Sequence, residues 1–129
     1  MSLRIVRLGS ARTRGEGTRI GVVRRPPRGV RKSEYASRDY FDAWLPELAP
    51  SQKWVSRALS RPWTDPRWAR YTKNYRREMR QPTPLRLLQL LAKLSQDADF
   101  SIGCYCQREE RCHRSLLREL LAENGAKLA

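Results

Sequence analysis

The spacing of apolar residues along this chain limits the folds that it can adopt. Residues 3–8, Leu-Arg-Ile-Val-Arg-Leu, alternate apolar and basic side chains and predict a β-strand. Residues 19–24 predict a second strand, because Pro26 and Pro27 follow it and cannot continue a strand ladder. Residues 99–105 predict a third strand near the end of the chain. The chain between the second and third strands is long enough to hold several helices.

Four segments predict these helices. Ser51 can cap a short helix that runs to about residue 60. Thr64 followed by Asp65 and Pro66 predicts a second helix to about residue 80, with an apolar stripe at helical spacing that comprises Trp68, Tyr71, Tyr75 and Met79. A third helix begins near residues 83–84, and its wide leucine face predicts that it is mostly buried. A last helix begins at residue 112 and ends at Gly125.

This alternation predicts an α/β fold. We expect one small domain over residues 1–129, with a short, mainly parallel sheet of three or four strands flanked by about four to five helices. The pattern over residues 33–51 is irregular and predicts no element there.

The chain carries a formal net charge of +14, and 22 of its 27 basic residues are arginine. A polycation associates with polyanions, so an anionic ligand or nucleic acid is the expected partner. Alternatively, the arginine content reflects genomic base composition alone. No apolar run is long enough to span a membrane and no signal peptide is visible, so we expect a cytoplasmic protein without a membrane partner. The sequence predicts no particular oligomeric state.

All three cysteines lie within nine residues, in the segment 104–114. This segment is predicted to run from the end of a strand to the start of a helix, where ligands of α/β proteins commonly bind. The helix N-terminus, Arg111 and Arg114 would lower the pKa of the Cys112 thiol. His113 beside it could act as an acid or a base, so Cys104, Cys112, His113 and Arg114 are the candidate catalytic residues.

Three interpretations of this segment remain open. In the first, it forms an active site with a reactive thiol or a bound anion. In the second, Cys104, Cys106, Cys112 and His113 hold zinc, although adjacent ligands at 112 and 113 diverge on a helix. In the third, the cysteines are structural and unreactive. We expect no cofactor under the first interpretation, and the sequence leaves open whether the protein is an enzyme.

A second basic cluster, residues 24–32, follows the second predicted strand. If the strands are parallel and adjacent, this loop lies at the same sheet edge as the cysteines. Arg25, Arg28 and Arg31, together with Arg111, are then candidate anion-binding residues. The alternative is an exposed loop without a ligand.

Several motifs together resemble the domain-of-unknown-function 488 (DUF488) family. They are Arg-Pro-Pro-Arg-Gly at residues 25–29, Phe-Asp-Ala-Trp-Leu-Pro-Glu-Leu-Ala-Pro-Ser at 41–51, Tyr-x3-Tyr-x2-Glu-Met at 71–79, and Cys-x7-Cys-His-Arg at 104–114. The resemblance implies a small α/β cytoplasmic protein of a prokaryote, with no assigned activity. It gives functional weight to Arg25, Arg28, Asp42, Cys104, Cys112, His113 and Arg114. Tyr71, Tyr75 and Glu78 are further residues of the family motifs.

This chain departs from the family pattern at two positions. Pro26 stands where one branch has tryptophan, and Cys106 stands where the Cys-His-Arg branch often has glutamate. The additional thiol favours metal or redox chemistry. Our leading hypothesis is an enzyme-like pocket for a phosphate or nucleotide, formed by the Cys-His-Arg helix start and the Arg-Pro-Pro-Arg-Gly loop. The alternatives are a non-catalytic nucleic-acid-binding module and a zinc-stabilised interaction domain.

Overall fold

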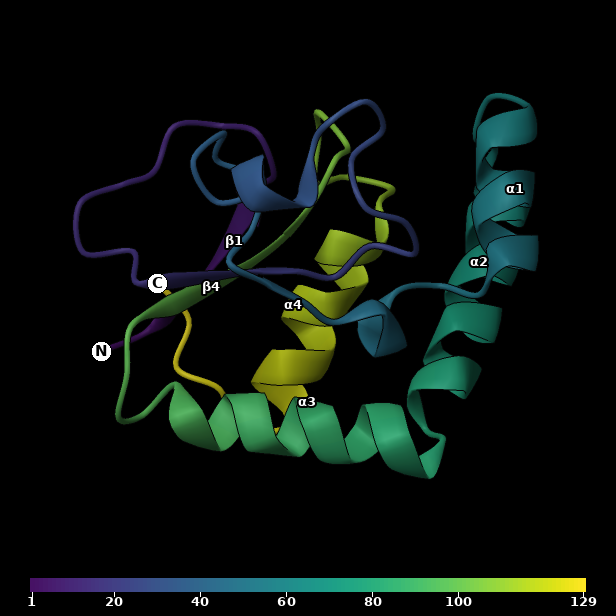
Figure 1. The fold of residues 1–129 in the computed structure, drawn as a ribbon. Coiled ribbons are helices and arrows are strands. Elements are labelled where there is room, and N and C mark those ends of the chain that lie inside the picture. Colours follow the sequence, from purple (N-terminus) through teal and green to yellow (C-terminus); the bar gives the residue numbers. More distant parts are fainter.

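A four-stranded, fully parallel sheet forms the centre of the protein (Figure 1). The computed structural model describes the backbone of residues 1–129 and all side chains except those of residues 58 and 59. The strands are β1 (Leu3–Arg7), β2 (Thr18–Gly21), β3 (Ala43–Trp44) and β4 (Phe100–Cys104), in the order β1-β4-β2-β3. The predicted α/β fold with a short parallel sheet is confirmed.

Four α-helices accompany the sheet over residues 1–129: α1 (Gln52–Ser60), α2 (Asp65–Met79), α3 (Pro82–Leu94) and α4 (His113–Glu123). Two short 3-10 turns, Lys32–Glu34 and Pro46–Leu48, lie in the segment between β2 and α1. Helix α4 packs between the sheet and α3, and α2 contacts α4 (Figure 1). Helices α1 and α2 form a hairpin at one side of the molecule.

The predicted start of α2 is confirmed in detail. Thr64 is the N-cap, and its hydroxyl accepts a hydrogen bond from the Arg67 N–H at 3.3 Å. The apolar stripe of this helix faces the core, where Tyr71, Tyr75 and Met79 are buried. They pack with Leu residues of α3 and α4 and with the sheet residues Leu3 and Ile102 in one continuous cluster.

Strand pairing places β4 at the centre of the sheet. Ile102 of β4 lies between Ile5 of β1 and Ile20 of β2 in the register of the sheet. All five β4 residues are buried, which is typical of a central parallel strand. Because β4 and β2 are neighbours and parallel, the segments that follow them leave the sheet at the same edge.

The sheet face opposite this core contains an ion pair that the sequence analysis missed. The Arg19 side chain, with no exposed surface, donates to Glu16 through Nε at 2.7 Å and through Nη2 at 3.0 Å. The Ser101 hydroxyl donates to the same carboxylate at 2.7 Å. This network ties the loop before β2 to the two central strands.

Three sequence predictions require correction. Residues 43–44, within the segment predicted to be irregular, form β3 beside β2. Strand β2 ends at Gly21 rather than at residue 24. Helix α3 is not mostly buried, since Leu90 is 52% and Leu94 42% exposed. Its leucines cover a wider arc than the surface that α4 and the turn at 46–48 offer, so one side faces solvent.

Among the described residues, no helix is long and apolar enough to cross a membrane.

Candidate functional site: a cysteine cluster at the edge of the sheet

The cysteine segment connects the end of the central strand to the start of the last helix, as predicted. Cys104 is the last residue of β4, and Cys112 is the N-cap of α4. The side chain of Cys112 makes no capping hydrogen bond, so its thiol is free to face the cluster. Arg111, immediately before it, has a φ of 52°, a left-handed conformation that turns the chain into the helix.

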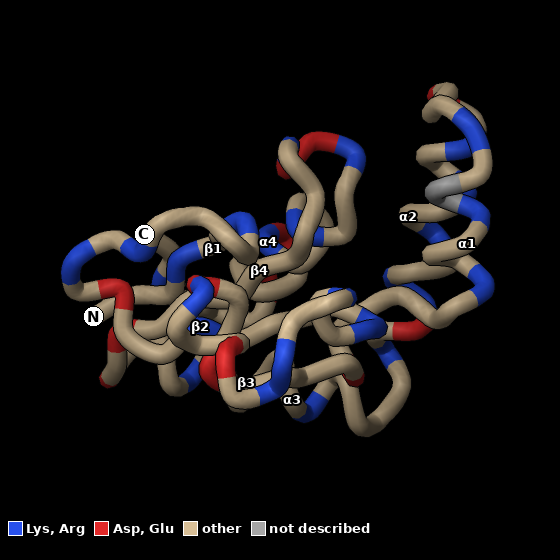
Figure 2. Tube along the Cα trace, turned by 45° about the horizontal axis from the view of Figure 1, so that its top comes forward, with Lys and Arg blue, Asp and Glu red and all other residues tan. Residues whose placement is uncertain are grey.

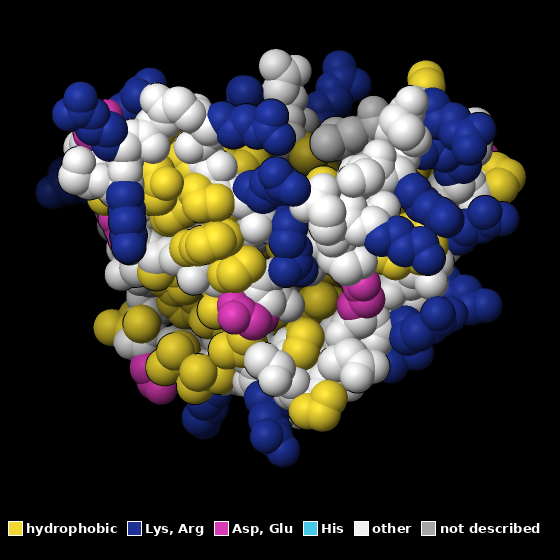
Figure 3. Space-filling view, turned by 45° about the vertical axis from the view of Figure 1, so that its right-hand side comes forward, with side chains coloured by type: hydrophobic (Ala, Val, Ile, Leu, Met, Phe, Trp, Pro, Cys, Tyr) yellow, Lys and Arg dark blue, Asp and Glu magenta, His cyan; other side chains and the backbone are white. Residues whose placement is uncertain are grey.

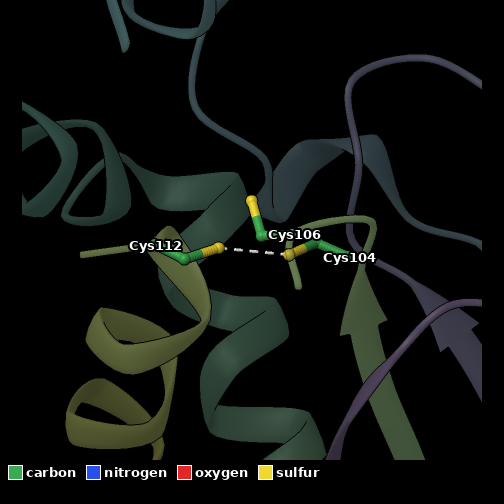
Figure 4. A group of neighbouring side chains, drawn as sticks. All are labelled: Cys104, Cys106 and Cys112. Carbon is green, nitrogen blue, oxygen red and sulfur yellow. Dashed lines mark hydrogen bonds between the residues drawn. The ribbon is translucent and has the colours of Figure 1, made fainter. Parts of the chain in front are cut away.

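The three thiols meet in space (Figure 4). The sulfur atoms of Cys104 and Cys112 are 3.2 Å apart, and all three cysteine sulfurs lie within 4.8 Å of one another. Cys104 and Cys112 are buried, whereas Cys106 is exposed, and all three are free cysteines. Cys106 is therefore the thiol that a solute can reach, with two further thiols behind it.

The environment favours ionisation of Cys106. Hydrogen bonds from Cys104 and Cys112 are the main cause, and the charge of Arg114 adds to them. Together they outweigh burial and lower the pKa of Cys106 to about 3, from its ordinary value of 9.0. The pKa of Cys104 is raised, because hydrogen bonding with Cys106 and Cys112 and burial all favour its protonated form. These shifts favour the thiolate form of Cys106 and the protonated form of Cys104.

His113 is fixed in one tautomer by the strand beside it. Its Nε2 lies 2.8 Å from the carbonyl oxygen of Val22, which can only accept, so Nε2 carries the proton in the neutral ring. Nδ1 then presents its lone pair toward Cys112 Sγ, 3.8 Å away. The Tyr75 ring packs edge-to-face against the imidazole at 5.9 Å. His113 is therefore placed to accept the Cys112 thiol proton.

Arg114 is a buried cation without an acidic partner. Its side chain is 4% exposed, and its Nη2 donates to the carbonyl oxygen of Cys106 at 2.7 Å. Its Nε has no hydrogen-bond partner, and no carboxylate among the described residues forms an ion pair with it. An unpartnered buried guanidinium is costly unless a negative charge compensates it. Here the Cys106 thiolate or a bound anion can do so.

The basic loop 24–32 lies beside the cysteine segment, as the shared sheet edge predicts. The Tyr105 hydroxyl donates to the Arg25 carbonyl oxygen at 2.8 Å, and this contact joins the two segments directly. The Arg25 guanidinium donates to Gln52 Oε1 at 3.3 Å. Arg28 and Arg31 are exposed. The loop thus borders the cysteine segment, with the side chains of Arg28 and Arg31 on the solvent side.

The remaining candidate residues have contacts that stabilise the fold around the cluster. Arg111 forms an ion pair with Asp65 of α2. The Tyr75 hydroxyl donates to the buried carbonyl of Leu48 at 2.6 Å. Glu78 accepts the backbone N–H of Ser51, the residue before α1, at 3.0 Å.

Asp42 and Tyr71 are the last two candidate residues. Asp42 accepts from Arg12 at 2.8 Å and from the Arg19 N–H at 2.8 Å. Burial opposes its ionisation, but these two donors outweigh it and lower the pKa of Asp42. The pKa of Tyr71 is raised, first by burial and then by the charge of the nearby cysteines. Tyr71 therefore stays protonated beside the cluster.

The fold and the cluster define a small α/β protein with a thiol-lined site at the carboxyl edge of a parallel sheet. The sequence model of a family described as the active DUF488-N3 subclade matches residues 3–125, and the chain belongs to the DUF488 family. No curated protein and no solved structure matches it.

Proposed function

We propose that this protein binds an anionic ligand of phosphate or nucleotide type between the start of α4 and the loop 24–32, next to a reactive cysteine. The observation that carries the proposal is the buried Arg114, whose Nε has no hydrogen-bond partner and which forms no ion pair with a carboxylate among the described residues. A guanidinium presents several N–H donors that match the oxygens of a phosphate.

The surrounding residues support an enzyme-like site. The low pKa of Cys106 supplies a thiolate, which is the nucleophilic form of cysteine, at neutral pH. His113 can accept a proton on Nδ1. The start of α4 adds the partial positive charge of a helix N-terminus. Nucleophile, proton acceptor and anion-binding group therefore lie on one edge of the sheet.

Alkylation kinetics test this proposal. We expect iodoacetamide to label Cys106 faster than a free cysteine at pH 6, and inorganic phosphate or AMP to slow the labelling. In Arg114→Gln the protection by phosphate is lost. Arg108→Gln serves as the matched control, because Arg108 is an exposed arginine of the same loop with no ion pair among the described residues. Protection that is equal in both variants would overturn the proposal.

A soft metal ion is the second candidate, and the three convergent sulfurs favour it. Cysteine thiolates are preferred ligands of zinc. His113 is not part of this group, because its ring nitrogens are not among the ligand atoms that lie within 4.8 Å of one another. The four-ligand set expected from the sequence therefore becomes a three-cysteine set.

Cobalt substitution distinguishes the two functions. A three-cysteine site gives thiolate-to-cobalt charge-transfer absorption when Co²⁺ is added to the reduced protein, and Zn²⁺ abolishes that absorption. Cys106→Ser weakens the absorption, whereas His113→Gln leaves it unchanged. Absence of the band at saturating Co²⁺ would exclude the metal site and leave the anion site unaffected.

A further inference from the structure

We propose that the hairpin of α1 and α2, residues 52–79, binds a single-stranded polynucleotide, with bases against its indole rings and phosphates on its arginines. The inference does not depend on the anion site, because it rests on other residues, the arginines and indole rings of the hairpin.

Half of the net charge of the protein lies on this hairpin and the residue at either end of it. Residues 51–80 carry nine lysine or arginine side chains and two carboxylates, which leaves seven of the fourteen charges of the chain. Blue segments follow one another along both helices in Figure 2, and Lys and Arg side chains gather on this side of the molecule in Figure 3.

Few of these cations are neutralised. Among the residues that the structure describes, Arg76 is the cation of the hairpin that pairs with carboxylates, those of Glu119 and Glu123. Asp65, one of the two acidic residues, is taken by Arg111. The other, Glu78, accepts a backbone N–H. Apart from Arg67, which donates to backbone carbonyls, the remaining lysine and arginine side chains are exposed and available to a polyanion.

A cleft of about 350 Å³ opens on this hairpin. Trp54, Trp63 and Tyr71 supply its aromatic walls, and Arg57, Arg61 and Arg70 lie around it. The guanidinium of Arg57 lies 5.0 Å from the ring centroid of Trp54. Aromatic walls bordered by arginines are the combination by which single-stranded nucleic acids are bound without strict sequence preference.

The cleft is held in shape before any ligand arrives. Arg67 stacks 5.2 Å from the Trp63 ring and donates to the carbonyl oxygens of Arg57, Arg61 and Pro62 at the turn between the helices. Trp63 also packs edge-to-face on Tyr71 at 5.2 Å. A preformed site loses less entropy on binding.

The shape and composition favour a single strand over other polyanions. In a duplex the bases are stacked and paired, so only phosphates would reach the hairpin. An acidic peptide or a lipid headgroup would pair with the arginines but would leave the indole walls of the cleft unused. A single strand satisfies both features, since each nucleotide brings a planar base and a phosphate.

Fluorescence anisotropy with a labelled oligothymidylate of about twenty nucleotides, long enough for one binding site, tests the inference on the full chain. We expect tighter binding than to a duplex of equal length, with affinity falling steeply as salt rises. In the triple variant Arg57→Gln, Arg61→Gln, Arg70→Gln, a plot of log affinity against log salt concentration becomes less steep. Its slope changes by about 2, because each lost phosphate contact accounts for about 0.7. Affinity at low salt falls at least tenfold.

The matched control removes the same charge elsewhere, in Arg7→Gln, Arg14→Gln, Arg38→Gln, whose arginines are exposed and lie outside the hairpin. It retains most of the affinity. Trp54→Leu, checked for native circular dichroism, weakens binding about tenfold without changing the salt slope, because stacking is not electrostatic. Equal losses in the two triple variants, or equal binding of duplex and single strand, would overturn the inference.

Discussion

The buried pair of Glu16 and Arg19 makes a quantitative prediction about stability. Glu16 is 2% exposed, and its carboxylate accepts from Arg19, Ser101 and the backbone N–H of Thr13. Burial disfavours its ionisation, but these donors outweigh burial and lower the pKa of Glu16 from 4.5 to about 2. The carboxylate is therefore more stable in the folded protein than in the unfolded chain.

The pKa difference translates into free energy. At 1.36 kcal/mol per unit, ionised Glu16 contributes about 3 kcal/mol to folding at neutral pH. Because the folded pKa is the lower one, this contribution is complete above the unfolded pKa of 4.5 and is lost as the pH falls toward 2. Glu16→Gln leaves Arg19 buried without a counter-charge, which costs about 3–5 kcal/mol at pH 7.

Urea denaturation followed by tryptophan fluorescence measures this effect. We expect Glu16→Gln to be destabilised by about 3–5 kcal/mol at pH 7. The difference in the free energy of unfolding between this variant and the wild type should narrow as the pH approaches 2. Asp97→Asn, at an exposed carboxylate without an ion pair among the described residues, should differ little from the wild type. If Glu16→Gln does not fold, Ser101→Ala, which removes one donor, should cost about 1–2 kcal/mol. A destabilisation of Glu16→Gln below about 1 kcal/mol, or one that does not change with pH, would refute the conclusion that ionised Glu16 stabilises the fold.

Three further substitutions test close contacts that hold the fold together. Gly17 has a φ of +78°, and a Cβ there would lie 1.9 Å from the Asp99 carbonyl oxygen, whereas Gly15 has the same φ with nothing within 4 Å. Gly17→Ala should therefore prevent stable folding, whereas Gly15→Ala should lower the stability by only about 1–2 kcal/mol. Thermal denaturation measures both effects, and equal effects of the two substitutions would contradict this reasoning. Tyr75→Phe leaves the buried Leu48 carbonyl without its hydroxyl donor and should cost about 1–3 kcal/mol in urea. An unchanged denaturation midpoint would show that this hydrogen bond contributes nothing.

Local patterns were sufficient to predict the elements that frame the site. The alternation in β1, the cap of α2 and the change from strand to helix across the cysteine segment are properties of short stretches of sequence. The structure confirms each of them, and also the shared edge of the cysteine segment and the loop 24–32. Strand β3 escaped prediction because two residues are too few to show a period.

The sequence alone determined that three thiols, an imidazole and an arginine lie at one junction between a strand and a helix. All of these residues belong to the single short segment that forms this junction. Only the tertiary structure decided which of them act together. It assigned His113 to the Val22 carbonyl, left Arg114 without an ion pair among the described residues, and joined Glu16 to Ser101 across 85 positions. It also left one side of α3 in solvent. Such pairings depend on how distant segments pack against one another. The periodic pattern of apolar residues does not show which side chain of a distant segment will be the partner.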